Sequence, residues 1–381
     1  MRKNFKHVAK TIIYPMIVFF GTIFFRKRKK LRPESIHSVL IVNLGLIGDG
    51  LLVTPLIAKA QRQFPTDCII DMLITPSSFI AIKNNPRINH AFIYNAFWTE
   101  RANNHRHTLW WNHVIESFRV LRKLRKEKYD MVINTWFVDQ PLTGFLLLFS
   151  GAKCLSGFEF KYSKNMYDIS IPFDKNKHIV DNLMTLLYPL FNGLYENEIR
   201  DKIEYYVGNY ELPMDLSQNY ILVSPFTSER TKSWRKENWY LVIQWLNENY
   251  PNYQVVLTGD KDSILQSMDY INNPYIKIFN LVGKSSFDTY AMLVKNAKLI
   301  VSVESSAMHL SSAFNIPIFI LFSRIYNFNQ FIPRHNLFAY SALDVECAEC
   351  IYGCSNPICM DHKPEKVIAK LGQFVKNENI L

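Results

Sequence analysis

One carboxylate, Asp49, stands in the glycine-punctuated stretch "NLGLIGDGLLVTP", residues 43–55. The stretch follows the apolar run "SVLIV", which is typical of a buried strand, and precedes helical spacing over Leu51–Phe64. A carboxylate at the end of a strand, between two glycines, faces open space and can remove a proton from a hydroxyl. The same position suits an N-cap, in which the carboxylate accepts hydrogen bonds from helix N–H groups. These residues by themselves leave both interpretations open.

A second polar stretch, "SPFTSERTKSWRKENW", covers residues 224–239. The hydroxyls of Thr227 and Ser228 follow a predicted strand, and Lys232 comes just before a predicted helix. Hydroxyls and a lysine near a helix start suit a phosphate or diphosphate. An ordinary surface loop with common helix-start residues has the same composition.

A third stretch, "VSVESSAMHLSSAFNIP", covers residues 301–317 at a predicted strand-to-helix junction. Glu304, Ser305 and Ser306 can offer a carboxylate, hydroxyls and backbone N–H groups to an anion or a sugar. His309 falls on the first helical turn, where the alternative is a buried structural histidine.

Two further groups of residues have competing interpretations. Asp260, in "GDKD" after the run "YQVVLT", is placed to hold ribose hydroxyls or to form a polar turn. Four cysteines near the C-terminus are close enough in sequence to hold a structural zinc or to remain reduced thiols in a loop. They are Cys347, Cys350, Cys354 and Cys359.

The elements that must position these residues alternate between strand and helix patterns. Apolar runs such as "VLIVNL", "CIIDMLI", "YILVSP", "YQVVLTG" and "PIFILFS" alternate with helical spacings, which predicts parallel sheets with right-handed crossovers. A polar stretch at 190–216 predicts a linker between two α/β halves. We therefore expect an N-terminal segment at 1–35, a Rossmann-like domain at 36–205 and a second Rossmann-like domain at 206–381.

The charge of the chain is concentrated at its N-terminus. The formal net charge is +11, and residues 1–32 contain ten Lys or Arg and no acidic residue, so the remainder is nearly neutral. This distribution argues against a nucleic-acid partner. The apolar run "TIIYPMIVFFGTIFF" between the basic groups is shorter than the roughly 20 residues that span a bilayer. It favours an anchor on an anionic membrane surface over a solvated basic helix packed on the body. The basic helix expected around Arg119–Lys128 suggests a second membrane-facing patch.

These stretches, in this order, resemble glycosyltransferase family 9, the ADP-heptose:lipopolysaccharide heptosyltransferases. The resemblance covers about residues 38–370 and is carried by "VLIVNLGLIGDGLLVTPLIAKAQRQFP", "ILVSPFTSERTKSWRKENWYLVIQWL" and "NLVGKSSFDTYAMLVKNAKLIVSVESSAMHLSSAFNIPIFILF". It implies a GT-B fold, two Rossmann-like domains with an interdomain cleft. It also implies inversion at the anomeric carbon without a metal-dependent D-x-D, and we expect neither a metal nor a cofactor.

The resemblance also implies roles for the singled-out residues. Asp49 matches the family's catalytic base, and Lys232 matches the lysine that contacts the donor. Thr227 and Ser228 fall in its phosphate loop, and the stretch from Glu304 to His309 falls on its donor-binding turn. The chain departs from the family pattern with Glu for Asp, Ser for Gly and Ala for Pro in that turn, and with Asn for a basic residue after the first strand. These positions are Glu304, Ser306, Ala307 and Asn43.

The resemblance implies a function at the cytoplasmic face of the inner membrane. There the chain moves a heptose from ADP-heptose onto a lipid-linked oligosaccharide of the lipopolysaccharide core. The alternatives are a family member that uses another nucleotide-activated sugar, and a non-catalytic membrane-associated scaffold of the same fold. A nicotinamide-dependent dehydrogenase fits poorly, because Gly45, Gly48 and Gly50 do not have the G-x-G-x-x-G spacing.

Overall fold

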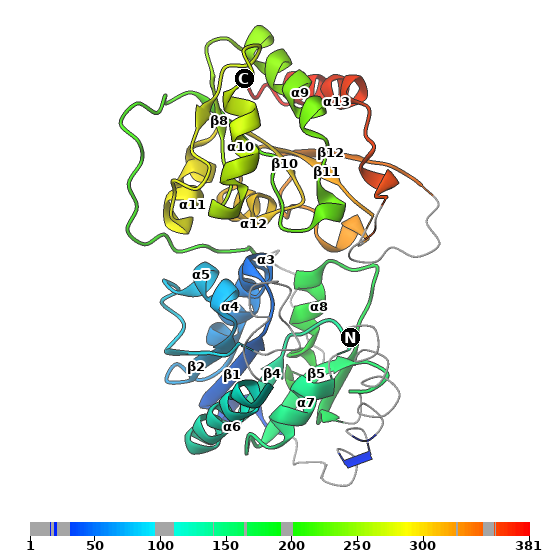
Figure 1. Cartoon of the computed structure of the whole chain (residues 1–381). Coiled ribbons are helices and arrows are strands. Elements are labelled where there is room, and N and C mark those ends of the chain that lie inside the picture. Colours follow the sequence, from blue (N-terminus) through cyan, green and yellow to red (C-terminus); the bar gives the residue numbers. More distant parts are fainter. Residues whose placement is uncertain are drawn as a thin grey trace. The chain divides into compact units, whose positions relative to one another are not determined.

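The computed structural model describes Met16, Phe19, Phe20 and residues 31–95, 110–139, 141–163, 166–191, 201–324, 327–345, 354 and 356–381. Of the predicted N-terminal segment at 1–35, only Met16, Phe19, Phe20 and residues 31–35 are among them, and the cysteines at 347 and 350 lie outside them. Within them, no helix is both long and apolar enough to cross a membrane. The chain divides into unit 1, Met1–Asp201, and unit 2, Lys202–Leu381 (Figure 1). The sequence placed this boundary between residues 205 and 206.

Within its described residues, unit 1 is built on a six-stranded sheet in the order β3-β2-β1-β4-β5-β6. All recorded strand pairs are parallel, as the alternation of elements predicts. The strands are β1 (Ser38–Asn43), β2 (Ile69–Ile74), β3 (His90–Ile93), β4 (Met131–Asn134), β5 (Cys154–Glu159) and β6 (Ile169–Pro172). The helices are α3 (Ile47–Leu52), α4 (Thr54–Gln63), α5 (Pro76–Ile82), α6 (Trp110–Glu127), α7 (Pro141–Leu148) and α8 (Ile179–Thr185).

Unit 2 has the same topology, with the strand order β12-β11-β10-β7-β8-β9 in its described part. Its recorded strand pairs are also parallel. The strands are β7 (Tyr220–Ser224), β8 (Gln254–Leu257), β9 (Phe279–Asn280), β10 (Leu299–Val303), β11 (Ile318–Phe322) and β12 (Phe338–Ala342). The helices are α9 (Lys236–Asn249), α10 (Ile264–Ile271), α11 (Phe287–Asn296), α12 (Ser306–Phe314) and α13 (Pro364–Asn377).

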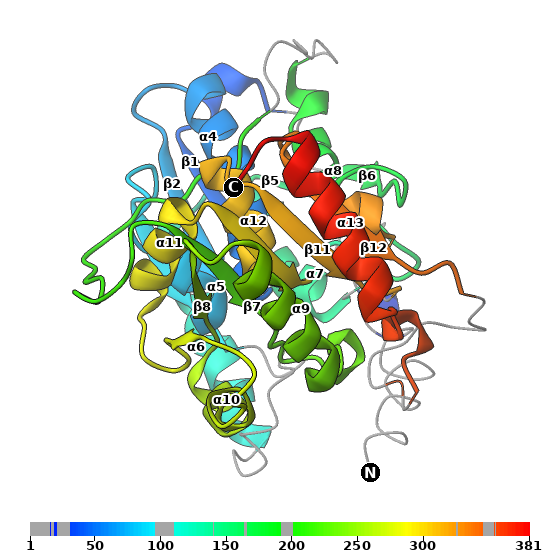
Figure 2. The same ribbon diagram turned by 90° about the horizontal axis from the view of Figure 1, so that it is seen from above.

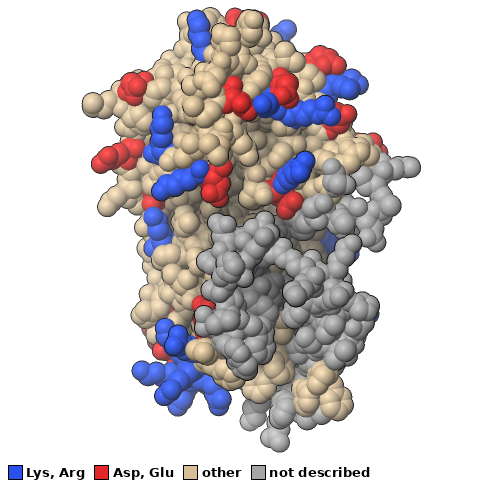
Figure 3. All heavy atoms as spheres, viewed as in Figure 1, with Lys and Arg blue, Asp and Glu red and all other residues tan. Residues whose placement is uncertain are grey.

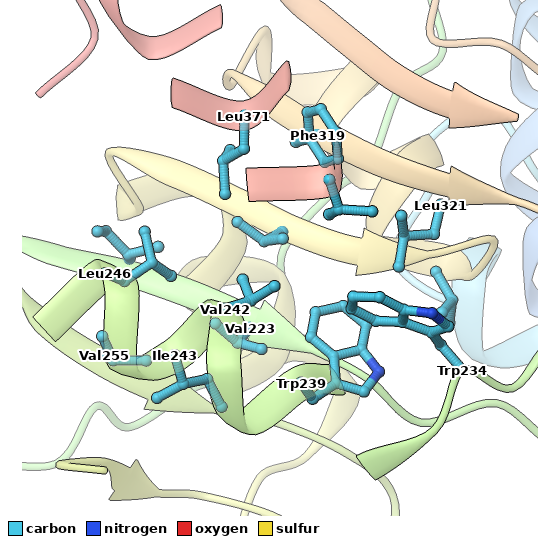
Figure 4. Packing of buried hydrophobic residues seen from close by; sticks show 14 of the residues in the cluster. Val223, Trp234, Trp239, Val242, Ile243, Leu246, Val255, Phe319, Leu321 and Leu371 are labelled. Carbon is cyan, nitrogen blue, oxygen red and sulfur yellow. The ribbon is translucent and has the colours of Figure 1, made fainter. Parts of the chain in front are cut away.

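The core of unit 2 joins its sheet to α9 and α13, which lie side by side (Figure 2). Side chains of β7 and β11, such as Val223 and Leu321, pack against Val242 of α9 and Leu371 of α13 (Figure 4). Burial of these apolar side chains is the main force that holds the helices on the sheet. Trp234, in the loop before α9, stacks edge to face on Trp239 with 5.2 Å between ring centroids. The core therefore extends up to the loop that carries Lys232.

The first helix of unit 1 differs from the prediction. The sequence predicts one helix over Leu51–Phe64, whereas α3 begins at Ile47 and α4 follows after Val53. Pro55 has no N–H group to bond with the carbonyl of Leu51, and the Thr54 hydroxyl donates to that carbonyl instead at 2.8 Å. Position 50 of α3 requires a glycine, because a Cβ atom there would lie 2.8 Å from the Ser78 carbonyl oxygen of α5. Close packing of α3 on α5 thus outweighs the low helix propensity of glycine.

Candidate functional site

Each sheet has a topological switch point, where the strand order reverses and ligands bind in open α/β sheets. In unit 1 this point lies between β1 and β4, and in unit 2 it lies between β7 and β10. Asp49 follows β1, Lys232 follows β7 and Glu304 follows β10. Asp49, Lys232 and Glu304 therefore lie beyond the carboxyl ends of strands that border a switch point, whereas Asp260 follows β8, one strand further from it.

Asp49 is the third residue of α3 rather than its N-cap, which is Leu46. Its Oδ2 atom accepts a hydrogen bond from the backbone N–H of Leu46 at 2.7 Å. The carboxylate passes so close to Gly45 that a Cβ atom there would lie 2.3 Å from Oδ2. Asp49 is half-buried. The predicted capping contact is therefore present in another form, from inside the helix, and it fixes the direction of a partly accessible carboxylate.

Asn43 fixes the turn that carries Asp49. It is buried, and its side-chain oxygen accepts from the N–H of Gly45 at 3.3 Å and from the Ser78 hydroxyl at 3.2 Å. Its amide nitrogen donates to the carbonyl of Asp49 at 3.1 Å. Where the family pattern often has a basic residue, this chain has an amide whose contacts are inside the fold. Thr75 adds a hydrogen bond to the Gly45 carbonyl at 2.6 Å.

In unit 2, Lys232 and Glu304 form an ion pair across the switch point. The Lys232 Nζ and Glu304 Oε2 atoms are 3.0 Å apart, and the two side chains are 18% and 7% exposed. The Ser323 hydroxyl, at the end of β11, donates to the same Oε2 atom at 3.0 Å. Trp234 anchors the loop after Lys232, because its indole N–H donates to the His362 carbonyl at 3.1 Å. The result is a cation held in place at the carboxyl edge of the sheet.

A set of hydroxyls surrounds the start of α12. Ser305 is the N-cap, and its Oγ atom accepts from the N–H of Ala307 at 3.3 Å. The Ser302 hydroxyl lies 3.0 Å from that of Ser305. Burial raises the pKa of Tyr290 to about 12, and hydrogen bonds with Ser224 and Ser306 oppose part of that rise. The phenol therefore remains neutral at pH 7 and can donate a hydrogen bond.

The other predicted donor-site residues have more local contacts. The Thr227 hydroxyl accepts from the N–H of Glu229 at 3.2 Å, and Ser228 is exposed. His309 is buried in α12. Asp260, after β8, accepts from the N–H and the hydroxyl of Ser263 at 3.0 and 2.6 Å, so it caps a short 3-10 turn. The described contacts of Asp260 are therefore those expected of a polar turn.

The predicted zinc cluster is only partly described. Cys347 and Cys350 lie outside the described residues. Cys359 is buried, Cys354 is half-buried, and both are free thiols. Among the residues that the structure describes, no group of three or more His, Cys, Asp or Glu is arranged to hold a metal ion.

The sequence reasoning missed Ser323 and Tyr290. Ser323 directly follows the apolar run of β11, so its place after a strand was a usable signal. Tyr290 lies inside α11, where nothing in the spacing separates it from a core tyrosine. Its proximity to Ser224 depends on how α11 packs on the sheet.

Residues 117–348 match the model of glycosyltransferase family 9 (heptosyltransferase). The match covers more than half of the chain. This chain belongs to glycosyltransferase family 9. It is therefore a glycosyltransferase, and its two Rossmann-like units are those of the GT-B fold.

Individual family members agree with this assignment. The chain is 24% identical over 289 residues to lipopolysaccharide heptosyltransferase 3 of Escherichia coli, covering 72% of this chain and 80% of the relative. The structure of a family 9 glycosyl transferase from Veillonella parvula aligns with a TM-score of 0.70 at 16% identity, over 92% of this chain and all of that one. The structure of Escherichia coli ADP-heptose lipopolysaccharide heptosyltransferase II aligns with a TM-score of 0.66 at 18% identity, over 90% and 99% of the two chains. At these identities the solved structures support the fold alone.

Proposed function

We propose that this family 9 enzyme transfers a heptose from ADP-heptose to the core oligosaccharide of lipopolysaccharide, with inversion at the anomeric carbon. The name of the Escherichia coli relative supports the sugar and the acceptor class. The single observation that carries the proposal is the Lys232–Glu304 pair at the switch point of unit 2, because it holds a cation where a diphosphate would bind.

In this mechanism Asp49 is the general base. Its carboxylate removes the proton from an acceptor hydroxyl as that oxygen attacks the anomeric carbon of the donor. The bond between that carbon and the diphosphate breaks on the opposite face of the sugar, which inverts the configuration. The contact with the N–H of Leu46 supports this role, because it orients the carboxylate before the acceptor arrives.

Unit 2 would stabilise the departing diphosphate. The ammonium of Lys232 and the backbone N–H groups at the start of α12, next to Ser305 and Ser306, offset the charge that builds on the leaving group. Glu304 and Ser323 hold Lys232 in place, and Thr227, Ser228, His309 and Asp260 complete the donor site. We accordingly assign the acceptor to unit 1 and the nucleotide-sugar to unit 2.

The N-terminal segment completes the proposal. Residues 1–32, with their ten basic side chains and apolar run, would hold the enzyme on anionic lipid at the cytoplasmic face of the inner membrane, where lipid-linked acceptors are made.

A thermal-shift screen with ADP-, UDP- and GDP-activated sugars tests the donor. A ligand at about 100 times its dissociation constant stabilises the protein by about 2.7 kcal/mol, so the true donor should raise the melting temperature and the others should not. If a UDP- or GDP-sugar raised the melting temperature more than ADP-heptose does, that sugar and not ADP-heptose would be the donor. Sugar transfer to a core acceptor, or donor hydrolysis, would exclude a non-catalytic scaffold.

A further inference from the structure

The outer face of α6 carries five cations and two large apolar side chains. Phe118 is 67% exposed and Ile115 is 45% exposed, so neither side chain packs in the core that α6 covers. With 3.6 residues per turn, these two positions and the cations fall within one side of the helix. The cations are Arg119, Arg122, Lys123, Arg125 and Lys126, and all of them are exposed.

Packing fixes which side of α6 faces outward. Val120 and Leu124 are buried in a core cluster that also contains Leu40 and Val42 of β1 and residues of α7. Rotation of the helix would expose these side chains to water, so the basic side cannot turn inward. A space-filling view shows Lys and Arg gathered over the end of α6 (Figure 3).

The cations of this face have no acidic partner within the part of the chain that the structure describes. No ion pair is recorded for any of the five, and the acidic Glu116 instead accepts the N–H of Asn95 at 3.3 Å. Like charges three or four residues apart, such as Arg119 with Lys123 and Arg122 with Lys126, destabilise a helix. An external anionic surface would remove that repulsion.

We propose that the outer face of α6 docks on the anionic headgroups of a phospholipid bilayer. The cations meet lipid phosphates, while Phe118 and Ile115 enter the interface between headgroups and acyl chains. The length of the helix, about 27 Å at 1.5 Å per residue, allows these contacts to lie along the membrane plane.

The exposed apolar side chains favour lipid over nucleic acid. Contacts with a phosphate backbone need cations and hydrogen-bond donors, and they give no reason for a large aromatic and an aliphatic side chain among them. Outside residues 1–32 the chain is also nearly neutral, so it has no general attraction for a polyanion. The residues of α6 lie far in sequence from the N-terminal segment at 1–32, and two linked contacts with one bilayer would strengthen each other.

The test is partition of the full-length protein onto vesicles of phosphatidylcholine with and without phosphatidylglycerol. One variant neutralises three cations of α6 and is written Arg119→Gln, Arg122→Gln, Lys126→Gln. The matched control neutralises three exposed lysines around α13 and is written Lys363→Gln, Lys366→Gln, Lys370→Gln. Both variants change the net charge equally and leave the buried core intact. An unchanged melting temperature verifies that each one folds.

Each cation near an anionic surface strengthens binding about fivefold, so the α6 variant should lose roughly 100-fold in partition coefficient while the control stays within about twofold. The partition coefficient of Phe118→Ser should be about tenfold lower than that of the wild type, because this variant has no aromatic ring to transfer from water into the bilayer interface. An α6 variant that binds like the control would overturn the proposal. A Phe118→Ser variant that binds like the wild type would also overturn it and would indicate a site for polyanions in general. Equal binding to vesicles with and without phosphatidylglycerol would overturn it as well. Transfer to a water-soluble acceptor should be unchanged in all variants, which separates this inference from the catalytic one.

Discussion

The Lys232–Glu304 pair allows a catalytic role to be separated from a structural one. At 3.0 Å, and with an effective dielectric constant of about 20, two unit charges attract each other by about 5.5 kcal/mol. The two side chains are only 18% and 7% exposed, so removal of one partner leaves a poorly solvated charge. Lys232→Ala should therefore lower the free energy of unfolding of unit 2 by about 3 kcal/mol. It should also slow sugar transfer by roughly 10²–10³.

The double variant Lys232→Ala, Glu304→Gln separates the effect on stability from the effect on the transfer rate. It removes both charges, and the amide oxygen at position 304 can still accept the Ser323 hydroxyl. Most of the lost stability should return, by about 2 kcal/mol, because no buried charge is left unpaired. Transfer should stay slow, because no cation faces the diphosphate.

Both quantities can be measured on one preparation of each protein. Urea unfolding gives the stability, and transfer at saturating donor gives the rate. If the double variant regained its transfer rate together with its stability, Lys232 would be a structural residue and its assignment to the leaving group would be wrong.

The remaining predictions concern the base, pH and the membrane. Gly45→Ala should place a methyl group against the Asp49 carboxylate and slow transfer roughly 10²-fold, as a displacement of about 1 Å can, without loss of donor binding; normal transfer would contradict the tight fit. Burial lowers the pKa of His335 from 6.5 to about 4, so as the pH falls this histidine is protonated in the unfolded chain before it is protonated in the folded one. The free energy of unfolding should therefore fall by about 1.4 kcal/mol per pH unit between pH 6.5 and 4. Urea titrations should show this slope, and His335→Asn should flatten it. Removal of residues 1–32 should weaken sedimentation with anionic vesicles in a salt-dependent way, and unchanged binding would refute the anchor.

The protonation of His335 has a defined structural consequence. Its Nδ1 atom accepts the N–H of Leu337 at 3.1 Å, so the neutral ring carries its proton on Nε2, which lies 2.7 Å from the Ser311 hydroxyl. A second proton on Nδ1 would remove the bond from Leu337. Stability is therefore present above pH 6.5 and is lost as the pH falls toward 4.

Much of the fold could be predicted from local patterns. Central strands such as β1, β7 and β10 are buried on both faces and read as continuous apolar runs. The edge strands β6 and β12, "ISIP" and "FAYSA", were missed; most of their residues are only partly buried, so they lack the continuous strongly apolar run of a central strand. Helix α13 was also missed, although its sequence carried a usable signal: Pro364 stands at its start, and the buried Val367, Leu371 and Phe374 have helical spacing.

The linker shows another limit of the sequence. Residues 202–219 lack helix and strand, as the polar composition predicts. Tyr205 is nevertheless buried, and its hydroxyl donates to Asp288 of α11 at 2.6 Å. Asp288 also accepts the N–H of Gly208 at 2.9 Å. A contact between residues 83 positions apart cannot be read from composition.

The candidate site divides in the same way. The hydrogen bond from Leu46 to Asp49 joins residues three positions apart, so a helix start with a carboxylate was enough to suggest it. The pairing of Lys232 with Glu304 depends on β7 and β10 being neighbours in the sheet, and the contact with Ser323 depends on β11 lying next to β10. The sequence indicated the residue types, while only the strand order brings them together.

Asp49→Asn tests whether Asp49 is the general base. Asparagine has nearly the same size and can still accept the N–H of Leu46, but it cannot act as a base at neutral pH. We expect a variant with a wild-type melting temperature and nucleotide affinity that transfers sugar roughly 10²–10⁴ times more slowly. A folded variant that transfers sugar at the wild-type rate would contradict it and leave Asp49 as a residue that only stabilises the start of α3.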